Sequence, residues 1–96
     1  MQQPIIGVLT LEIYVEESHS LKEKRHVVKS LKDRLRDRFN VSVAEIGHLD
    51  SWQASVVAVV TVSSDRVRAE QVLQAVEGHA AGMLGGALTG SGVEWL

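Results

Sequence analysis

Residues 5–15 alternate in character, and this alternation constrains the fold more than any other feature of the chain. One set of side chains is apolar: Ile5, Leu9, Leu11, Ile13 and Val15, with Gly7 among them. The intervening set is mixed: Ile6, Val8, Thr10, Glu12 and Tyr14. A repeat of two residues places the sets on opposite faces of a β-strand. The segment therefore predicts a strand with one face in a hydrophobic core.

The repeat changes after this strand and becomes helical. Ser20 and Glu23 form a Ser-x-x-Glu capping box, in which each side chain bonds a backbone N–H at the start of a helix. Apolar residues then recur at helical spacing: Leu21, Val27, Val28, Leu31, Leu35 and Phe39. We expect a helix from about residue 21 to about residue 38. Asn40 is expected to end it, because asparagine tolerates the left-handed conformation.

The remaining chain repeats the same kinds of signal. VSVAEI (41–46) and the very apolar ASVVAVVTV (54–62) predict two strands joined by the turn residues 47–53. Ser63, Ser64 and Asp65 are typical of a second helix start. The buried side of this second helix is then expected at Ala69, Val72, Leu73, Val76 and Ala80. Five glycines at 82, 85, 86, 90 and 92 indicate a loose connection, and VEWL (93–96) a short last strand.

The order strand–helix–strand–strand–helix–strand predicts an α+β, ferredoxin-like βαββαβ sandwich. Right-handed crossovers would place both helices on one face of a four-stranded antiparallel sheet. A length of 96 residues suits one such domain over residues 1–96.

Composition narrows the class of protein. The chain has no cysteine, which excludes disulfides, thiolate zinc sites and a cysteine nucleophile. The N-terminus lacks the basic region of a signal peptide, and no apolar run reaches the ~18 residues of a membrane helix. We therefore expect a cytoplasmic protein with no membrane association.

Positive charge is concentrated in one segment, although the net charge is only −2. Eight of the 10 Lys and Arg residues lie between residues 22 and 38 against three acidic residues, which gives this segment +5 and the rest of the chain −7. Such a distribution indicates what a surface attracts. Helical spacing places five of these side chains on or beside one stripe: Lys22, Arg25, Lys29, Lys32 and Arg36.

Like charges at positions i and i+4, such as Arg25 and Lys29, cost a helix roughly 0.2–0.5 kcal/mol each. Binding of nucleic-acid phosphate would compensate for that cost, and we name the five stripe residues as the candidate nucleic-acid-binding residues. The alternative is an ordinary solvated helix face. Lys24 points toward the apolar side, where its ammonium is expected to extend out to water.

The sheet face away from the helices is predicted to carry Val8, Thr10 and Glu12, with Val57 and Val59 beside them. An open patch of valines favours burial against a second copy of the chain. The alternative is that these side chains are scattered and need no cover. The whole chain has four aromatic residues, so base stacking on the sheet, as in RNA-recognition modules, is disfavoured.

The remaining polar and aromatic candidates favour structural roles. His48 and Asp50 are too few for a metal site, and Asp50 is expected to stabilise a turn. Trp52 is expected to pack over one end of the core rather than to stack on a base. There is no G-x-S-x-G motif, so we predict no enzyme, no catalytic residues and no cofactor. His19, which precedes the basic helix, is a weak candidate for proton transfer.

Three segments resemble the small bacterial YlxP-like family, a domain of unknown function: SLKEKR (20–25), FNVSVAEI (39–46) and DSWQ (50–53). The resemblance extends from the first strand through the third and is weak in the C-terminal GGALTGSGVEWL. It implies a ferredoxin-like fold and carries no catalytic residues. Members are often encoded among genes for translation and ribosome maturation, which implies an RNA or ribosomal partner.

Two functions follow as hypotheses. The first is a non-enzymatic RNA- or ribosome-associated module that contacts phosphates through the basic helix. The second is a homodimeric protein-interaction scaffold that packs through the open sheet face at Val8, Val57 and Val59. A small enzyme or ligand sensor would require a convergent polar pocket at the edge between sheet and helix.

Overall fold

The computed structural model describes residues 3–96 and has the predicted order of elements. The elements are β1 (Ile5–Tyr14), α1 (Leu21–Arg38), β2 (Ser42–Gly47), β3 (Ala54–Ser63), α2 (Arg66–Leu84), a short 3₁₀ turn (Gly85–Ala87) and β4 (Leu88–Trp95). The fold is the expected α+β ferredoxin-like sandwich. The described part of the chain contains no helix long and apolar enough to cross a membrane.

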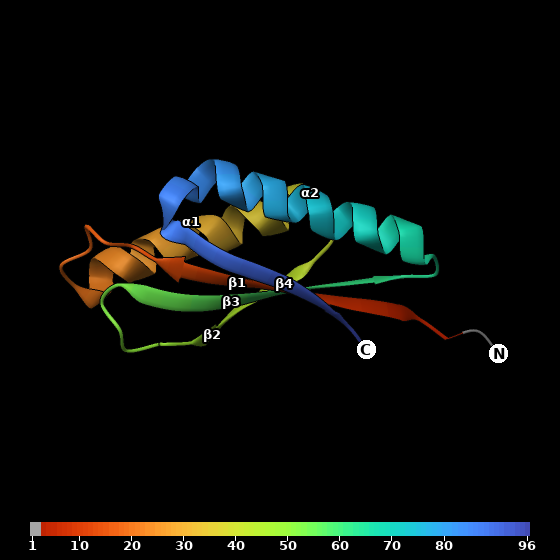
Figure 1. Cartoon of the computed structure of the whole chain (residues 1–96), viewed down its shortest axis with the longest axis horizontal. Coiled ribbons are helices and arrows are strands. Elements are labelled where there is room, and N and C mark those ends of the chain that lie inside the picture. Colours follow the sequence, from red (N-terminus) through yellow and green to blue (C-terminus); the bar gives the residue numbers. More distant parts are fainter. Residues whose placement is uncertain (1–2) are drawn as a thin grey trace.

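The four strands form one antiparallel sheet in the order β2-β3-β1-β4. The central strands β1 and β3 pair along their full length, from Ile5 opposite Ser63 to Tyr14 opposite Ala54. Strands β2 and β4 are therefore the two edges. Both helices cover the same face of the sheet, and β4 crosses in front of it in Figure 1.

The core lies between the helices and the covered face of the sheet. Leu9 and Leu11 from β1, Leu31 and Leu35 from α1 and Val76 from α2 are all fully buried there. The alternation of residues 5–15 is thus confirmed, because the apolar set faces the helices and the mixed set faces away. Burying each such side chain contributes about 1.5–3 kcal/mol.

Both helix starts are capped as the sequence predicts. The Ser20 Oγ accepts the Glu23 backbone N–H at 3.1 Å, and the Glu23 carboxylate accepts the His19 N–H at 2.7 Å. Asp65 caps α2 by accepting the Val67 N–H at 3.1 Å. The prediction for Asn40 is wrong: α1 ends at Arg38 in an extended Phe39, and among the described non-glycine residues only His48 has a positive φ, of 56°.

The C-terminal part is more regular than expected. Gly82 lies inside α2, and β4 spans Leu88–Trp95 rather than residues 93–96 alone. Gly90 opposes Glu12 of β1, and a side chain at Gly90 would collide with the Glu12 carboxylate. The Glu12 carboxylate is the end of a flexible, exposed side chain that can move aside, so packing does not require glycine here. Gly90 nevertheless lies in a paired strand and does not mark a flexible connection.

The prediction for the open sheet face is wrong at two residues. Val57 and Val59 are fully buried in the core, because they lie opposite Leu11 and Leu9 and therefore share the covered face. Val8 does lie on the open face, where its neighbour on β3 is Val60. The apolar residues that the strand pairing places on the open face include Ile6, Val8, Ala44, Val56, Ala58, Val60 and Val62. An open apolar face does exist, but β3 contributes Val56 and Val60 to it rather than Val57 and Val59.

A candidate polyanion-binding groove between α1 and β2

A groove of about 370 Å³ runs between α1 and the edge strand β2. Its lining residues are Arg25, Val28, Lys29, Lys32, Asp33 and Arg36 from α1 and Glu45 from β2. Four of the five stripe residues therefore lie together around one concave surface. Lys22 is exposed on the first turn of α1 but is not among the lining residues.

Two of the four groove cations are paired within α1. Asp33 accepts a hydrogen bond from the Lys29 ammonium at 2.6 Å and contacts the Arg36 guanidinium at 3.5 Å. The bond from Lys29 lowers the pKa of Asp33 below its ordinary value of 3.8, and the charges of Arg36 and Lys32 act in the same direction. Within residues 3–96, Arg25, Lys32 and Lys22 make no ion pair. Their charges are available to a ligand.

Arg36 also fixes the width of the groove. Its Nη2 donates to the Val43 carbonyl oxygen at 2.9 Å, and this bond ties the helix to the strand at one end of the groove. Together with the contact of Nη1 with Asp33, this bond holds the Arg36 guanidinium in the lining of the groove. This bond was not predictable from the sequence, because a backbone acceptor on a strand does not depend on which residue supplies it.

A buried lysine lies behind the other end of the groove. Lys24 is fully buried, and its ammonium donates to Glu45 Oε2 at 2.9 Å and to the carbonyl oxygens of His48 at 3.0 Å and Leu49 at 3.4 Å. Ser55 Oγ donates to the same Glu45 oxygen at 2.6 Å. The expectation that Lys24 extends to water is wrong, because the three oxygen atoms of Glu45, His48 and Leu49 replace its hydration.

Glu45 of β2 is the acidic partner of Lys24. Burial on its own would raise the pKa of Glu45, but the hydrogen bonds from Ser55 and Lys24 and the charge of Lys24 outweigh it. The pKa of Glu45 therefore lies below its ordinary value of 4.5. Glu45 is ionised at neutral pH, so Lys24 cancels its charge and the groove remains cationic.

The residues of the β2–β3 connection do not form a second site around the groove. His48 adopts the left-handed conformation that was expected of Asn40, and its carbonyl serves Lys24. Trp52 is 55% exposed, so the prediction that it packs over the core is wrong. Among residues 3–96, no three His, Cys, Asp or Glu side chains come together as a metal site would require. Asp50 is exposed on the same connection.

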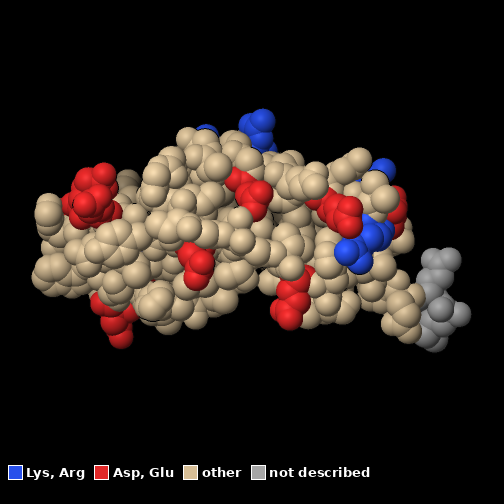
Figure 2. All heavy atoms as spheres, in the orientation of Figure 1, with Lys and Arg blue, Asp and Glu red and all other residues tan. Residues whose placement is uncertain are grey.

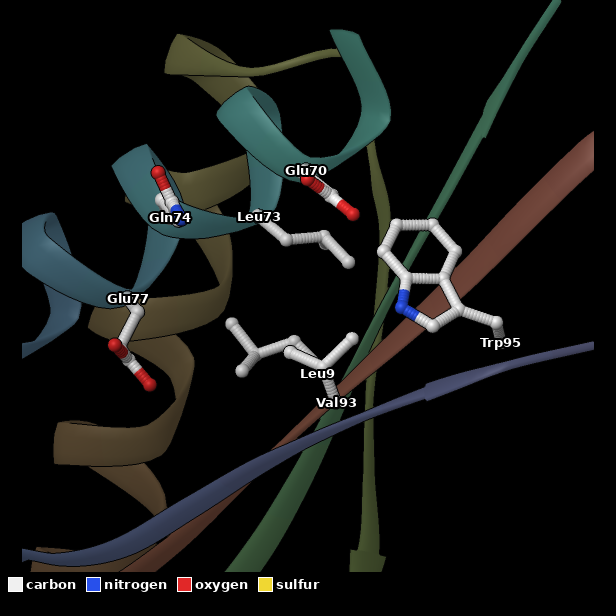
Figure 3. Close-up of a pocket in the computed structure, with 7 residues that line it drawn as sticks. All are labelled: Leu9, Glu70, Leu73, Gln74, Glu77, Val93 and Trp95. Carbon is white, nitrogen blue, oxygen red and sulfur yellow. The ribbon is translucent and has the colours of Figure 1, made fainter. Parts of the chain in front are cut away.

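A second cavity, of about 230 Å³, lies at the opposite edge of the sheet between α2 and β4. Figure 3 shows Leu73 pointing from α2 toward Leu9 and Val93, with Trp95 closing one side. Glu70, Gln74 and Glu77 of α2 also line this cavity. The Arg66 guanidinium lies 3.9 Å from the centre of the Trp95 ring and also bonds Glu70, so it is already paired.

The two edges of the molecule thus differ in charge. Figure 2 shows the side on which β4 lies in front, and acidic side chains are spread along it while Lys and Arg appear only toward its upper and right margins. Phosphate would be repelled from the α2–β4 edge and attracted to the α1–β2 edge. Of the two cavities, only the α1–β2 groove has the charge that a polyanion requires.

Comparison with known proteins identifies the class of protein and then its relatives. The chain belongs to the family described as "Protein of unknown function (DUF503)", whose model matches residues 6–90. It is 43% identical over 72 residues to "Uncharacterized protein YlxP" of Bacillus subtilis (strain 168), which covers 75% of this chain and 78% of that protein. The resemblance seen in the sequence is thereby confirmed.

Two solved structures share the fold at low sequence identity. The de novo designed protein Foldit4 has a TM-score of 0.54 and 13% identity, covering 98% of this chain and 94% of the design. A C-terminal segment of the alpha subunit of aIF2 from Pyrococcus abyssi also has a TM-score of 0.54, with 16% identity, covering 97% of this chain and 49% of that one. Both show the architecture alone.

Proposed function

We propose that this protein is a non-enzymatic RNA- or ribosome-associated module that binds the phosphate backbone in the groove between α1 and β2. The observation that carries the proposal is the convergence of Arg25, Lys29, Lys32 and Arg36 on one concave surface. A solvated helix face would not require its cations to line a groove. A ribosomal role would take place in the cytoplasm, which is part of the proposal.

The chemistry of the groove favours the backbone over the bases as the ligand. Lysine and arginine side chains neutralise phosphates and release counterions, so affinity falls as salt rises. The groove contains no aromatic side chain on which a base would stack. We therefore expect binding that depends strongly on salt and little on base sequence.

The test is the affinity of the protein for a structured RNA hairpin over a series of salt concentrations. With two to four phosphate contacts, a plot of log K against log salt should have a slope of roughly −2 to −4. A double variant, Arg25→Gln with Lys32→Gln, should reduce the magnitude of that slope by about 2, because each cation accounts for about 1.

The matched control is Arg34→Gln with Arg38→Gln. Both residues are exposed on the same helix, neither lines the groove, and the change in net charge is identical. The control should retain most of the affinity of the unmodified protein. Equal losses in the two double variants would show that charge alone matters, and a slope near zero would end the proposal.

The homodimeric scaffold stays a second proposal, because one observation favours it. The face of the sheet away from the helices carries an apolar patch at its centre, and Val62 at the end of β3 on this face is 59% exposed. With Val57 and Val59 in the core, the residues that would meet a partner are Val8, Val56 and Val60. Burying such a patch against a second copy would remove it from water.

Light scattering of the unmodified protein and of a Val60→Asp variant tests this second proposal. A dimer that becomes a monomer in the variant supports it, since Val60 lies in the middle of the open face opposite Val8. A protein that is monomeric without any substitution rules it out. Thr10→Ala, on the same face but without a new charge, is the control.

A further inference from the structure

One oxygen of Glu45 is free and faces the groove. Oε2 already accepts from both Lys24 and Ser55, whereas Oε1 accepts no hydrogen bond within residues 3–96. Among the described side chains, the only buried polar atom without a partner is His79 Nε2, so Oε1 must be in contact with solvent. The side chain as a whole is only 12% exposed, and it lines the groove. Glu45 therefore contributes one unoccupied acceptor to the lining of the groove.

A fixed acceptor is unusual at the centre of a surface that attracts phosphate. An ionised carboxylate accepts hydrogen bonds and cannot donate them. The lowered pKa keeps Glu45 in this form at neutral pH. The ligand must therefore present a donor between the phosphates that Arg25, Lys29 and Lys32 hold. A free phosphate ester or a DNA backbone has no such donor.

In RNA, the 2′-hydroxyl lies on the sugar between consecutive phosphates and is the group that distinguishes RNA from DNA. A single free oxygen fits one O–H donor. It does not fit the paired N–H groups of a guanine edge, which would need both carboxylate oxygens. We infer that Glu45 Oε1 accepts a hydrogen bond from a ribose 2′-hydroxyl in the groove and makes the protein selective for RNA over DNA.

This inference rests on the proposed function, and it adds a specificity-determining residue to it. The cations and Glu45 have different roles in recognition. The four cations attract any polyanion. Glu45 disfavours a backbone that has no donor for its free carboxylate oxygen. The network of Lys24 and Ser55 holds the carboxylate in place, so its free oxygen keeps a fixed direction.

The experiment compares three hairpins of one sequence on the unmodified protein: RNA, DNA, and RNA in which every 2′-hydroxyl is replaced by 2′-fluorine. The fluorinated hairpin keeps the shape of an RNA helix but has no donor at the 2′ position. We expect both the DNA and the fluorinated RNA to bind about tenfold more weakly, the loss typical of one hydrogen bond to a charged group. If the DNA hairpin binds weakly but the fluorinated RNA binds as tightly as the unmodified RNA, the protein recognises helix shape and the inference is overturned.

A Glu45→Gln variant tests the residue itself. Lys24 and Ser55 both donate to the position of Oε2, so they select the amide oxygen there and leave the amide NH₂ facing the groove. The variant therefore converts the acceptor into a donor. We expect the ratio of RNA affinity to fluorinated-RNA affinity to fall to about one, with DNA affinity raised because a negative charge has been removed.

Glu17→Gln is the control, because it makes the same substitution and the same change in charge at an exposed residue that does not line the groove. It should keep the preference for RNA. A thermal unfolding curve of each variant identifies any that fail to fold, and the hairpin comparison on the unmodified protein needs no variant. If no hairpin binds, the proposed function fails; if all three bind equally, only the 2′-hydroxyl inference fails.

Discussion

Lys24 is the residue on which the local structure around the groove most depends. Its ammonium has no exposure to water and relies on three oxygen atoms, one of them charged. Removing one partner of such a buried pair leaves an uncompensated charge, which costs far more than the intact pair contributes. The two carbonyl groups of His48 and Leu49 would also lose their donor.

We expect Lys24→Met to lower the free energy of unfolding by about 3–5 kcal/mol, although methionine retains the apolar stem. Urea denaturation measures this loss. Lys22→Met, an exposed position two residues earlier, should change the free energy by less than about 0.5 kcal/mol. A loss below about 1 kcal/mol for Lys24→Met would mean that water replaces the missing ammonium.

Glu45 makes stability depend on pH in the acid range. Its pKa is lower in the folded protein than its ordinary value of 4.5. A lowered carboxyl pKa contributes stability that is present above the unfolded value and is lost as the pH falls through the folded value. The free energy of unfolding should therefore fall below about pH 4.5, and the fall should be less steep in Glu45→Gln. Urea denaturation at several pH values between 3 and 7 measures the difference.

Asp33→Asn provides the comparison for that experiment. The pKa of Asp33 is also lowered, but its ion pairs lie on the exposed surface of α1, where solvent screens them. Asp33→Asn should change the fall in the free energy of unfolding at acid pH less than Glu45→Gln does. Equal effects of the two variants would indicate that the burial of Glu45 has no influence on stability.

At the scale of the element, the start of α1 determines where the basic residues point. Ser20 Oγ accepts the Glu23 N–H and the Glu23 carboxylate accepts the His19 N–H, and these bonds fix the first turn. Arg25 and Lys29 then follow at helical spacing. Ser20→Ala should lower the free energy of unfolding by about 1 kcal/mol, since it removes the acceptor for an N–H with no partner in the helix. Thermal or urea unfolding measures this.

Ser30→Ala is the matched control for the cap. Ser30 is exposed in the middle of α1, where alanine is the better helix former, so the variant should be as stable as the unmodified protein or slightly more so. If both serine substitutions have the same effect, the capping box does not stabilise the helix.

The elements were predictable from the sequence to different degrees. The strand at 5–15 and the helix from residue 21 carry clear periods, and both the boundaries and the faces followed from them. ASVVAVVTV has apolar residues at both odd and even positions, so its period could not say which valines face the core. Only the pairing of Val57 with Leu11 settles that, and it is a long-range contact.

The part of the candidate site that depends on local spacing was predictable, and the part that depends on long-range contacts was not. Helical spacing gathers Arg25, Lys29, Lys32 and Arg36 without any tertiary information. The contact of Lys24 with Glu45 joins residues 21 positions apart and depends on how α1 lies over β2. One signal was available: Glu45 shares strand parity with Val41 and Val43, so it belonged to the covered face and needed a partner there.

At the scale of the whole molecule, charge is divided between two edges of one sheet. The edge at β2 carries the cationic groove, and the edge at β4 carries a cavity lined by Glu70 and Glu77. Strands β3 and β1 lie between the two edges, so a polyanion in the groove contacts β2 and not β4. Binding should thus perturb the molecule on one side only.

Backbone amide shifts in NMR spectra, recorded as the RNA hairpin is added, test this expectation. The largest changes should occur in α1 and β2, and the amides of β4 and the first half of α2 should move little. The Arg25→Gln, Lys32→Gln double variant should show smaller changes in the same residues. Shifts spread equally over both edges would contradict a single binding surface.

The two tryptophans have consequences for how this protein can be observed. Trp95 is sandwiched between the Arg66 guanidinium and the backbone of Gly7, while Trp52 stands in water on the connection whose carbonyls hold Lys24. Their indole rings therefore emit from unlike surroundings without any added dye. Replacing either one by phenylalanine would leave a single tryptophan, whose emission is separated from that of Tyr14 by the choice of excitation wavelength.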